Sequence, residues 1–133
     1  MSTLGSLRSA ILVGLGGFVG SIVRYFVGGW VHRSLSLSTF PVGTLVVNVS
    51  GCFLIGLLGG AVAARQAFGP DARLFLMIGV LGGYTTFSSF AYETLSLVRD
   101  AELARAGANV VLQIVLGLAA AWGGDALARI GPP

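Results

Sequence analysis

The stretch GGYTTFSSFAYE, from Gly82 to Glu93, decides the fold of this 133-residue chain. It lies inside an apolar run, Leu74 to Val98, long enough to cross about 30 Å of hydrocarbon as a helix. Two glycines followed by two threonines make a poor continuous helix, because glycine costs conformational entropy and threonine is stiff at its β-carbon. Broken backbone at membrane depth is tolerated where protein buries it or where it lines a wet cavity. We therefore predict a spanning helix broken near its middle; the alternative is a kink that serves only packing.

The rest of the chain predicts a membrane protein as well. Three further runs can each cross a bilayer, namely Ala10–Val31, Phe40–Ala64 and Ala106–Ala128. Apolar residues make up 55% of the chain and charged residues 10%, and the mean hydropathy is +0.90. A soluble domain has about 25% charged residues, and an outer-membrane barrel would alternate in segments of about ten residues. We predict one all-α, multi-pass membrane domain over residues 1–133, with four transmembrane helices.

All eight basic residues are arginines, and they are scattered singly along the chain. A nucleic-acid partner is therefore not expected, because its footprint would cluster basic residues on one face. Arg24 interrupts the first run where a secretory signal would be cleaved, so we expect that run to remain as a helix. An up-and-down path divides the arginines almost equally between the two sides, so the positive-inside rule selects no orientation. Either packing fixes one topology, or the chain inserts both ways up and forms antiparallel dimers.

Glycine totals 21 residues and forms three G-x-x-x-G pairs: Gly16 and Gly20, Gly56 and Gly60, and Gly79 and Gly83. Such pairs let helix backbones approach closely in lipid, where packing drives association. They do not show whether the partner helix belongs to the same chain. Because four helices are few for enclosing a pore, we expect an oligomer, in particular a dimer.

Polar residues inside the spans indicate a path for a solute. Helical spacing puts five of them on one stripe of the third span and two aromatic rings on the adjacent stripe; the polar set is Thr85, Ser89, Tyr92, Glu93 and Ser96, and the rings are Phe87 and Phe90. In the second span Thr44 and Asn48 share a face, and a mid-membrane asparagine is costly unless its amide is satisfied.

Three more polar residues have open roles in the sequence. Arg24 either snorkels to the interface or attracts anions to an entrance. Glu93 is a carboxyl well inside a span and so a functional candidate. Gln113 either lines the path or bridges helices. One histidine, one cysteine and no carboxylate pair exclude the usual catalytic and metal constellations, so we predict a conduit and not an enzyme.

These motifs resemble the Fluc (CrcB) family of fluoride channels. The resemblance rests on the Gly82–Glu93 stretch, on GTLVVN at Gly43–Asn48 and on GSIVR at Gly20–Arg24. It implies an antiparallel, dual-topology homodimer in the bacterial plasma (inner) membrane. Two pores would export fluoride passively from the cytoplasm and lower its toxicity.

The resemblance also implies roles for particular residues. A structural sodium ion at the dimer centre would be held by the backbone carbonyls of Gly82 and Thr85 from both subunits. The residues implied at the pore or its vestibule are Asn48, Phe87, Phe90, Ser89, Thr86, Glu93 and Arg24. The fourth helix departs from the family pattern, with Gly117 and Ala121 where Ser or Thr often completes a polar track.

Two other functions remain open from the sequence. Small multidrug resistance exporters are also four-span, dual-topology dimers, but their coupling carboxylate is normally in the first helix, where this chain has Arg24. Glu93 would then have to carry the proton. A non-transporting assembly module is the third possibility, and it predicts no ion flux.

Overall fold

The structure is a computed structural model that describes residues 3–35 and 40–130. Every element in these ranges is helical: α1 (Thr3–Leu35), α2 (Val42–Arg65), α3 (Pro70–Arg73), the π-helical η1 (Leu74–Val80), α4 (Leu81–Tyr84), α5 (Phe87–Arg99) and α6 (Leu103–Arg129). Four spans are long and apolar enough to cross a membrane: α1, α2, the composite helix from Pro70 to Arg99, and α6. The predicted all-helical, multi-pass architecture is confirmed.

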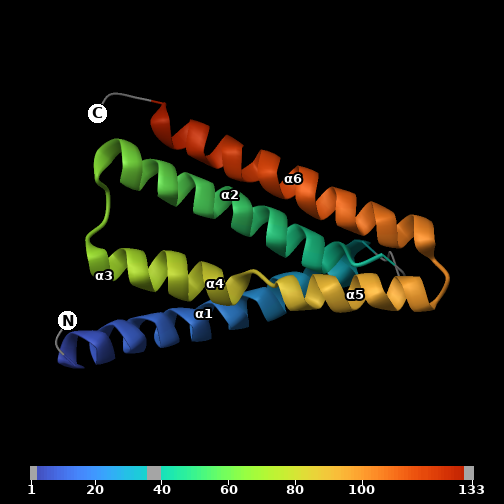
Figure 1. Cartoon of the computed structure of the whole chain (residues 1–133), viewed down its shortest axis with the longest axis horizontal. Coiled ribbons are helices and arrows are strands. Elements are labelled where there is room, and N and C mark those ends of the chain that lie inside the picture. Colours follow the sequence, from blue (N-terminus) through green and yellow to red (C-terminus); the bar gives the residue numbers. More distant parts are fainter. Residues whose placement is uncertain (1–2, 36–39, 131–133) are drawn as a thin grey trace.

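The composite third span is interrupted where the sequence predicts a break. Between α4 and α5 the chain runs as a short extended thread, visible in Figure 1. The start of α1, the end of α6 and the α2–α3 connection lie at one end of the molecule, and the α5–α6 connection lies at the other (Figure 1). The chain therefore runs up and down, as four short-looped spans require.

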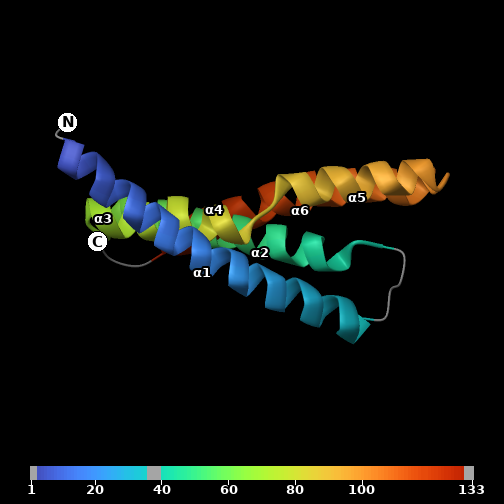
Figure 2. The same ribbon diagram turned by 90° about the horizontal axis from the view of Figure 1, so that it is seen from below.

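The helix α1 is longer than the sequence pattern indicates. It begins at Thr3 rather than Ala10 and ends at Leu35 rather than Val31. At about 1.5 Å per residue its 33 residues extend to about 50 Å, which exceeds the hydrocarbon thickness. A helix longer than the bilayer accommodates by tilting, and Figure 2 shows α1 crossing the third span obliquely.

The G-x-x-x-G pairs pack inside the subunit. A Cβ built on Gly79 would lie 2.9 Å from the Cα of Gly16, and one built on Gly60 would lie 2.8 Å from the Cβ of Ala128. A Cβ on Gly56 would overlap the backbone of Ala121. These glycines let α1 approach the third span and let α2 approach α6. They are therefore explained without a partner chain.

The interior is small and the surface is apolar. Val47, Leu81 and Tyr84 form the buried cluster, against which partly buried side chains pack. Large hydrophobic side chains point outward on every long helix, and the two tryptophans, Trp30 and Trp122, are 65% and 74% exposed. A soluble protein does not cover itself in this way, so the surface is that of a protein that faces lipid or another protein.

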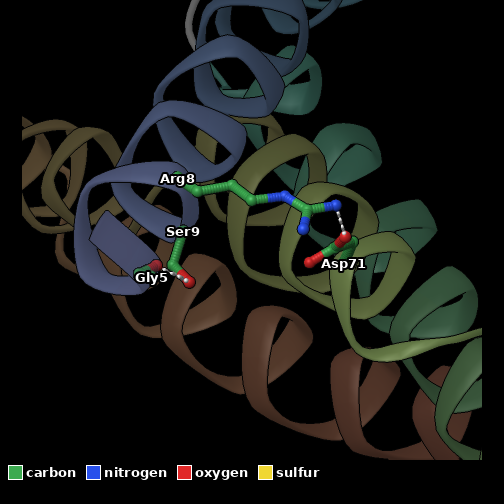
Figure 3. A network of polar contacts seen from close by, with 4 residues as sticks. All are labelled: Gly5, Arg8, Ser9 and Asp71. Atoms are coloured by element: carbon green, nitrogen blue, oxygen red, sulfur yellow. Dashed lines mark hydrogen bonds and ion pairs between the residues drawn. The ribbon is translucent and has the colours of Figure 1, made fainter. Parts of the chain in front are cut away.

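Charged contacts gather at the ends of the helices. Figure 3 shows Arg8 near the start of α1 reaching Asp71 at the start of α3, while Ser9 donates to the Gly5 carbonyl. At the same end of the molecule, Arg65 donates to the carbonyl of Ile130 at 2.8 Å. These contacts tie the helix ends together outside the apolar zone.

Candidate functional site at the helix break

Two threonines make the interruption of the third span. Thr85 has φ −82° and ψ 157°, and Thr86 has φ −150° and ψ 111°, so both are extended. The hydroxyl of Thr86 accepts from the Ser89 backbone N–H at 3.2 Å and donates to the Ser89 hydroxyl at 3.0 Å. Thr86 is thus the N-cap of α5, a position that favours a side-chain oxygen. The first threonine thus caps the end of α4, and the second caps the start of α5.

Asn48 on α2 replaces the helical hydrogen bond that the break removes. Its Oδ1 accepts from the Thr86 N–H at 2.8 Å, and its Nδ2 donates to the Thr86 carbonyl at 3.0 Å. In a continuous helix that N–H would bond the carbonyl of Gly82, four residues earlier. Buried backbone groups need partners, and this two-point contact supplies them. The predicted requirement that the Asn48 amide be satisfied is confirmed.

The hydrogen bond from the Thr86 N–H to Asn48 leaves main-chain oxygens available at the break. Because the Thr86 N–H is used by Asn48, the Gly82 carbonyl does not receive its helical donor. Gly82 is exposed, with open space where a Cβ would be. The carbonyl of Thr85 accepts a long contact from Arg24 Nη1 at 3.5 Å, near the limit of a hydrogen bond. Unwound carbonyls of this kind coordinate sodium in membrane proteins, so the donor set fits the implied ion.

Within the described ranges, no cluster of three or more His, Cys, Asp or Glu side chains offers an alternative metal site.

A groove of about 410 Å³ runs beside the break. Its polar wall includes Asn48 and Gln113, and its aromatic wall is Phe87 and Phe90. The two ring centroids lie 5.4 Å apart at 62°, an edge-to-face pair, and the edge of such a ring carries its positive charge. Phe87 is 79% exposed, so the groove opens onto the surface of the subunit.

Gln113 on α6 lines the groove, and the sequence did not decide whether it lines the path or bridges helices. Its Oε1 accepts from Asn48 Nδ2 at 3.1 Å. Its Nε2 is buried and has no hydrogen-bond partner among the described residues. The signal in the sequence was a glutamine in an otherwise apolar run, and the structure shows that it both bridges helices and lines the groove. It therefore presents a free N–H donor next to Asn48.

A second hollow lies on the other side of Thr86. Its volume is about 400 Å³, and its walls include Arg24, Thr44, Thr86 and Ser89. Thr86 also lines the groove and therefore borders both spaces, whereas Asn48, which is hydrogen-bonded to it, lines the groove.

A third hollow of about 660 Å³ adjoins the second through Thr44 and contains Glu93. Thr44 donates to Glu93 Oε1 at 2.6 Å, whereas Glu93 Oε2 is buried without a hydrogen-bond partner in the described ranges. Ser96 lies in the same hollow, but Tyr92 is 69% exposed and lines none of the three spaces. The predicted polar stripe is therefore divided among the spaces: Thr85 lines the groove, Ser89 the second hollow, and Glu93 and Ser96 the third.

The departures in the fourth helix have a packing explanation. Gly117 is buried, and a Cβ there would lie 3.4 Å from Cys52 Sγ. Ala121 presents its backbone to Gly56 at the close α2–α6 contact. Neither position lines the groove, so the polar contribution of α6 comes from Gln113.

The fold and the site define a small multi-pass membrane protein whose central helix is interrupted to expose main-chain and amide groups. The chain belongs to the CrcB family, because the model of "CrcB-like protein, Camphor Resistance (CrcB)" matches residues 11–125. A protein of Opitutus terrae is 48% identical over 91% of this chain and 92% of its own length. One of Solibacter usitatus is 47% identical over 90% and 97%, and one of Methylocella silvestris 46% over 86% and 88%. All three are named "Fluoride-specific ion channel FluC". The resemblance seen in the sequence is confirmed.

Proposed function

We propose that this chain is the subunit of a fluoride channel that exports fluoride passively across the bacterial inner membrane. The observation that carries the proposal is the groove at the break, where amide donors and aromatic ring edges converge without a lysine or arginine among them. Conduction requires binding that is weak enough for release, and neutral donors meet that requirement. The name of the relatives supports the same substrate.

The groove suggests how fluoride sheds its water. Nδ2 of Asn48 already donates to Thr86 and Gln113, whereas Nε2 of Gln113 has a free N–H. An anion in the groove would gain the Nε2 donor of Gln113, and also the Nδ2 donor of Asn48 once the contact between the two amides opens. The edges of Phe87 and Phe90 would face the ion from the other wall. In the proposed dimer, a second copy would narrow this groove to a path that excludes the larger chloride.

The second and third hollows would serve as the approach to the groove. Arg24 would raise the local concentration of anions there. The hydroxyls of Thr86 and Ser89 would provide uncharged donors between Arg24 and the groove. Thr44 holds one oxygen of Glu93, so that carboxyl would stay in the third hollow and outside the groove. It would therefore not repel fluoride inside the groove.

A second, inverted copy of the chain would close the groove. The balanced arginines favour insertion in both orientations, and Phe87 is too exposed in one subunit to enclose a path alone. The carbonyls of Gly82 and Thr85 from both copies would hold a structural sodium ion, which would supply positive charge and link the two breaks. Two pores, one per groove, follow from the symmetry.

A proton-coupled exporter is the weaker explanation. Its carboxylate would have to be Glu93, which is bonded to Thr44 and lies outside the groove of Phe87 and Phe90. A channel passes fluoride without moving protons, whereas a coupled exporter changes the pH inside the vesicle as fluoride leaves.

The test is fluoride efflux from liposomes that contain the purified protein, followed with a fluoride electrode. Equal pH on both sides and a potassium ionophore isolate passive flux, and chloride is measured alongside. We expect rapid fluoride release and retained chloride. Vesicles that keep their fluoride would reject the proposal, and fluoride release coupled to a change in the pH inside the vesicles would favour the exporter.

A further inference from the structure

Asn109 on α6 is a buried polar residue that the proposed pathway does not use. Its side chain is 0% exposed, and with Val47 it is one of the two largest side chains that are fully buried in the described ranges. It lines none of the three hollows. An amide removed from water is costly unless it is hydrogen-bonded, so its place between helices needs an explanation.

The amide of Asn109 begins a short chain of hydrogen bonds that ends on Phe90. Nδ2 of Asn109 donates to the hydroxyl of Thr94 at 2.9 Å, and that hydroxyl donates to the Phe90 carbonyl at 2.8 Å. The hydroxyl has one proton, so it can donate to Phe90 only if its other partner is a donor. The N–H of Asn109 satisfies this condition. These two hydrogen bonds, from Asn109 to Thr94 and from Thr94 to Phe90, form a relay. The relay connects α6 to the backbone of a residue that lines the groove.

The helix that receives this relay depends on its neighbours for its position. α5 has 13 residues, is separated from α4 by the extended Thr85 and Thr86, and packs mainly on α6. On the α2 side, Glu93 is held by Thr44. Rotation of α5 about its axis would move Phe87 and Phe90 together, because residues three apart share a face.

We propose that Asn109 and Thr94 are positioning residues that fix the rotation of α5 and thereby place the rings of Phe87 and Phe90 for selection of the anion. This inference rests on the proposed function, in which those rings line the pore. The relay acts on the Phe90 backbone, so its loss changes ring position while leaving every pore side chain present.

The test compares Thr94→Val, which keeps the shape and removes the hydroxyl, with Thr94→Ser, which keeps the hydroxyl. A matched control is Tyr84→Phe, which removes a side-chain hydrogen bond of 2.8 Å to Ser50 between α2 and α4. Fluoride and chloride efflux and the melting temperature in detergent are measured for each. One net hydrogen bond corresponds to about three- to tenfold in a population, so we expect Thr94→Val to slow fluoride by about that factor and to raise the chloride-to-fluoride ratio. Thr94→Ser should keep the wild-type ratio.

The control separates positioning from general stability. Tyr84→Phe should lower the melting temperature and leave the chloride-to-fluoride ratio unchanged. If Thr94→Val leaves that ratio unchanged, or if Tyr84→Phe alters it equally, the positioning role is wrong. Asn109→Leu, measured in the same way, should reproduce Thr94→Val.

A double variant tests whether the relay acts through the ring. In a Phe90→Ile background, Thr94→Val should add no further change in the flux ratio, whereas independent sites would give additive effects. Additive effects would overturn the proposal. If the proposed function is wrong, Phe90→Ile alone will leave the fluoride flux unaltered. If only the relay is wrong, Phe90→Ile will still reduce the fluoride flux, but Thr94→Val will have the wild-type flux and chloride-to-fluoride ratio.

Discussion

Asn48 and Thr86 are joined at two points, since Oδ1 of the asparagine accepts from the threonine N–H at 2.8 Å and its Nδ2 donates to the threonine carbonyl at 3.0 Å. The side chain of one helix thus completes the backbone of another, 38 positions away in the sequence. This contact keeps the break open and also forms the wall of the groove. Under the proposed function, stability and permeation would therefore depend on the same residue.

The variant Asn48→Asp should abolish most of the fluoride flux. It keeps an acceptor for the Thr86 N–H, but it removes the donor to the Thr86 carbonyl and to Gln113 and adds an anionic charge. A buried group left without its partner costs about 1–3 kcal/mol. Efflux from liposomes and thermal unfolding in detergent measure the two effects. Wild-type efflux from Asn48→Asp would remove this residue from the pore.

The two ring substitutions Phe87→Ile and Phe90→Ile should slow fluoride by at least about tenfold, because a loss of about 1.4 kcal/mol of ion stabilisation has that effect. Isoleucine fills similar space but has no ring edge. The control is Phe18→Ile, on a ring of α1 that is 65% exposed and lines none of the hollows. Flux is measured with the fluoride electrode. An equal loss in the control would attribute the effect to folding instead of permeation.

The variant Gln113→Met should reduce fluoride flux with little loss of stability. The substitution removes the free Nε2 donor and a single accepted bond from Asn48. One net hydrogen bond contributes about 1 kcal/mol to stability, so the melting temperature should fall only slightly. The fluoride flux should fall severalfold. Unchanged transport at reduced stability would make Gln113 a helix bridge alone.

The close glycine contact of α1 with the third span predicts a strong effect of one methyl group. Gly20→Ala would drive its Cβ into the carbonyl of Val80, and overpacking of this kind costs about 1–3 kcal/mol. Gly14→Ala, on the same helix, meets nothing within 4 Å. It should be neutral or stabilise by up to about 1 kcal/mol, since alanine is the better helix former. Thermal unfolding of both variants decides whether packing or helix propensity governs α1.

The turn between α5 and α6 offers a stabilising substitution. Ala101 has φ 60°, and the N–H of Glu102 donates to the Leu97 carbonyl at 2.8 Å, the geometry of a helix end that favours glycine. Ala101→Gly should raise stability by about 1 kcal/mol, because the left-handed conformation costs that much for residues with a Cβ. Ala104→Gly, three residues on in α6, should lower stability by a similar amount. Thermal unfolding measures both variants, and a change in stability of the same sign for the two would contradict this explanation.

The sequence predicts the elements here better than their contacts. The four spans follow from hydropathy over windows of bilayer length, and the break follows from adjacent glycines and threonines, which are local signals. The helix ends were less predictable, because α1 continues through polar residues to Leu35. The identity of the helix facing each glycine pair depends on tertiary packing, which periodicity does not contain.

The distribution of the polar residues among the three spaces could also not be predicted from the sequence, because it depends on how the helices pack. Helical spacing groups Tyr92 with Glu93, but Tyr92 is exposed and Glu93 turns towards Thr44. The bonds of Asn48 to Thr86 and of Asn109 to Thr94 join helices, so no local pattern could supply them. A sequence signal for Asn109 existed, since it lies four residues before Gln113 on the same face of α6.

The hydrogen bonds that Asn48 and Ser89 make to Thr86 at the interruption lie within one polypeptide. Under the proposed function, each copy would therefore bring these bonds to the dimer already formed, and the shared sodium ion would add the contacts to the Gly82 and Thr85 carbonyls. In the proposed dimer, association would join two preformed halves without remodelling either backbone. The rate of assembly would then be set by lateral encounter in the membrane, and not by a slow rearrangement of the third helix.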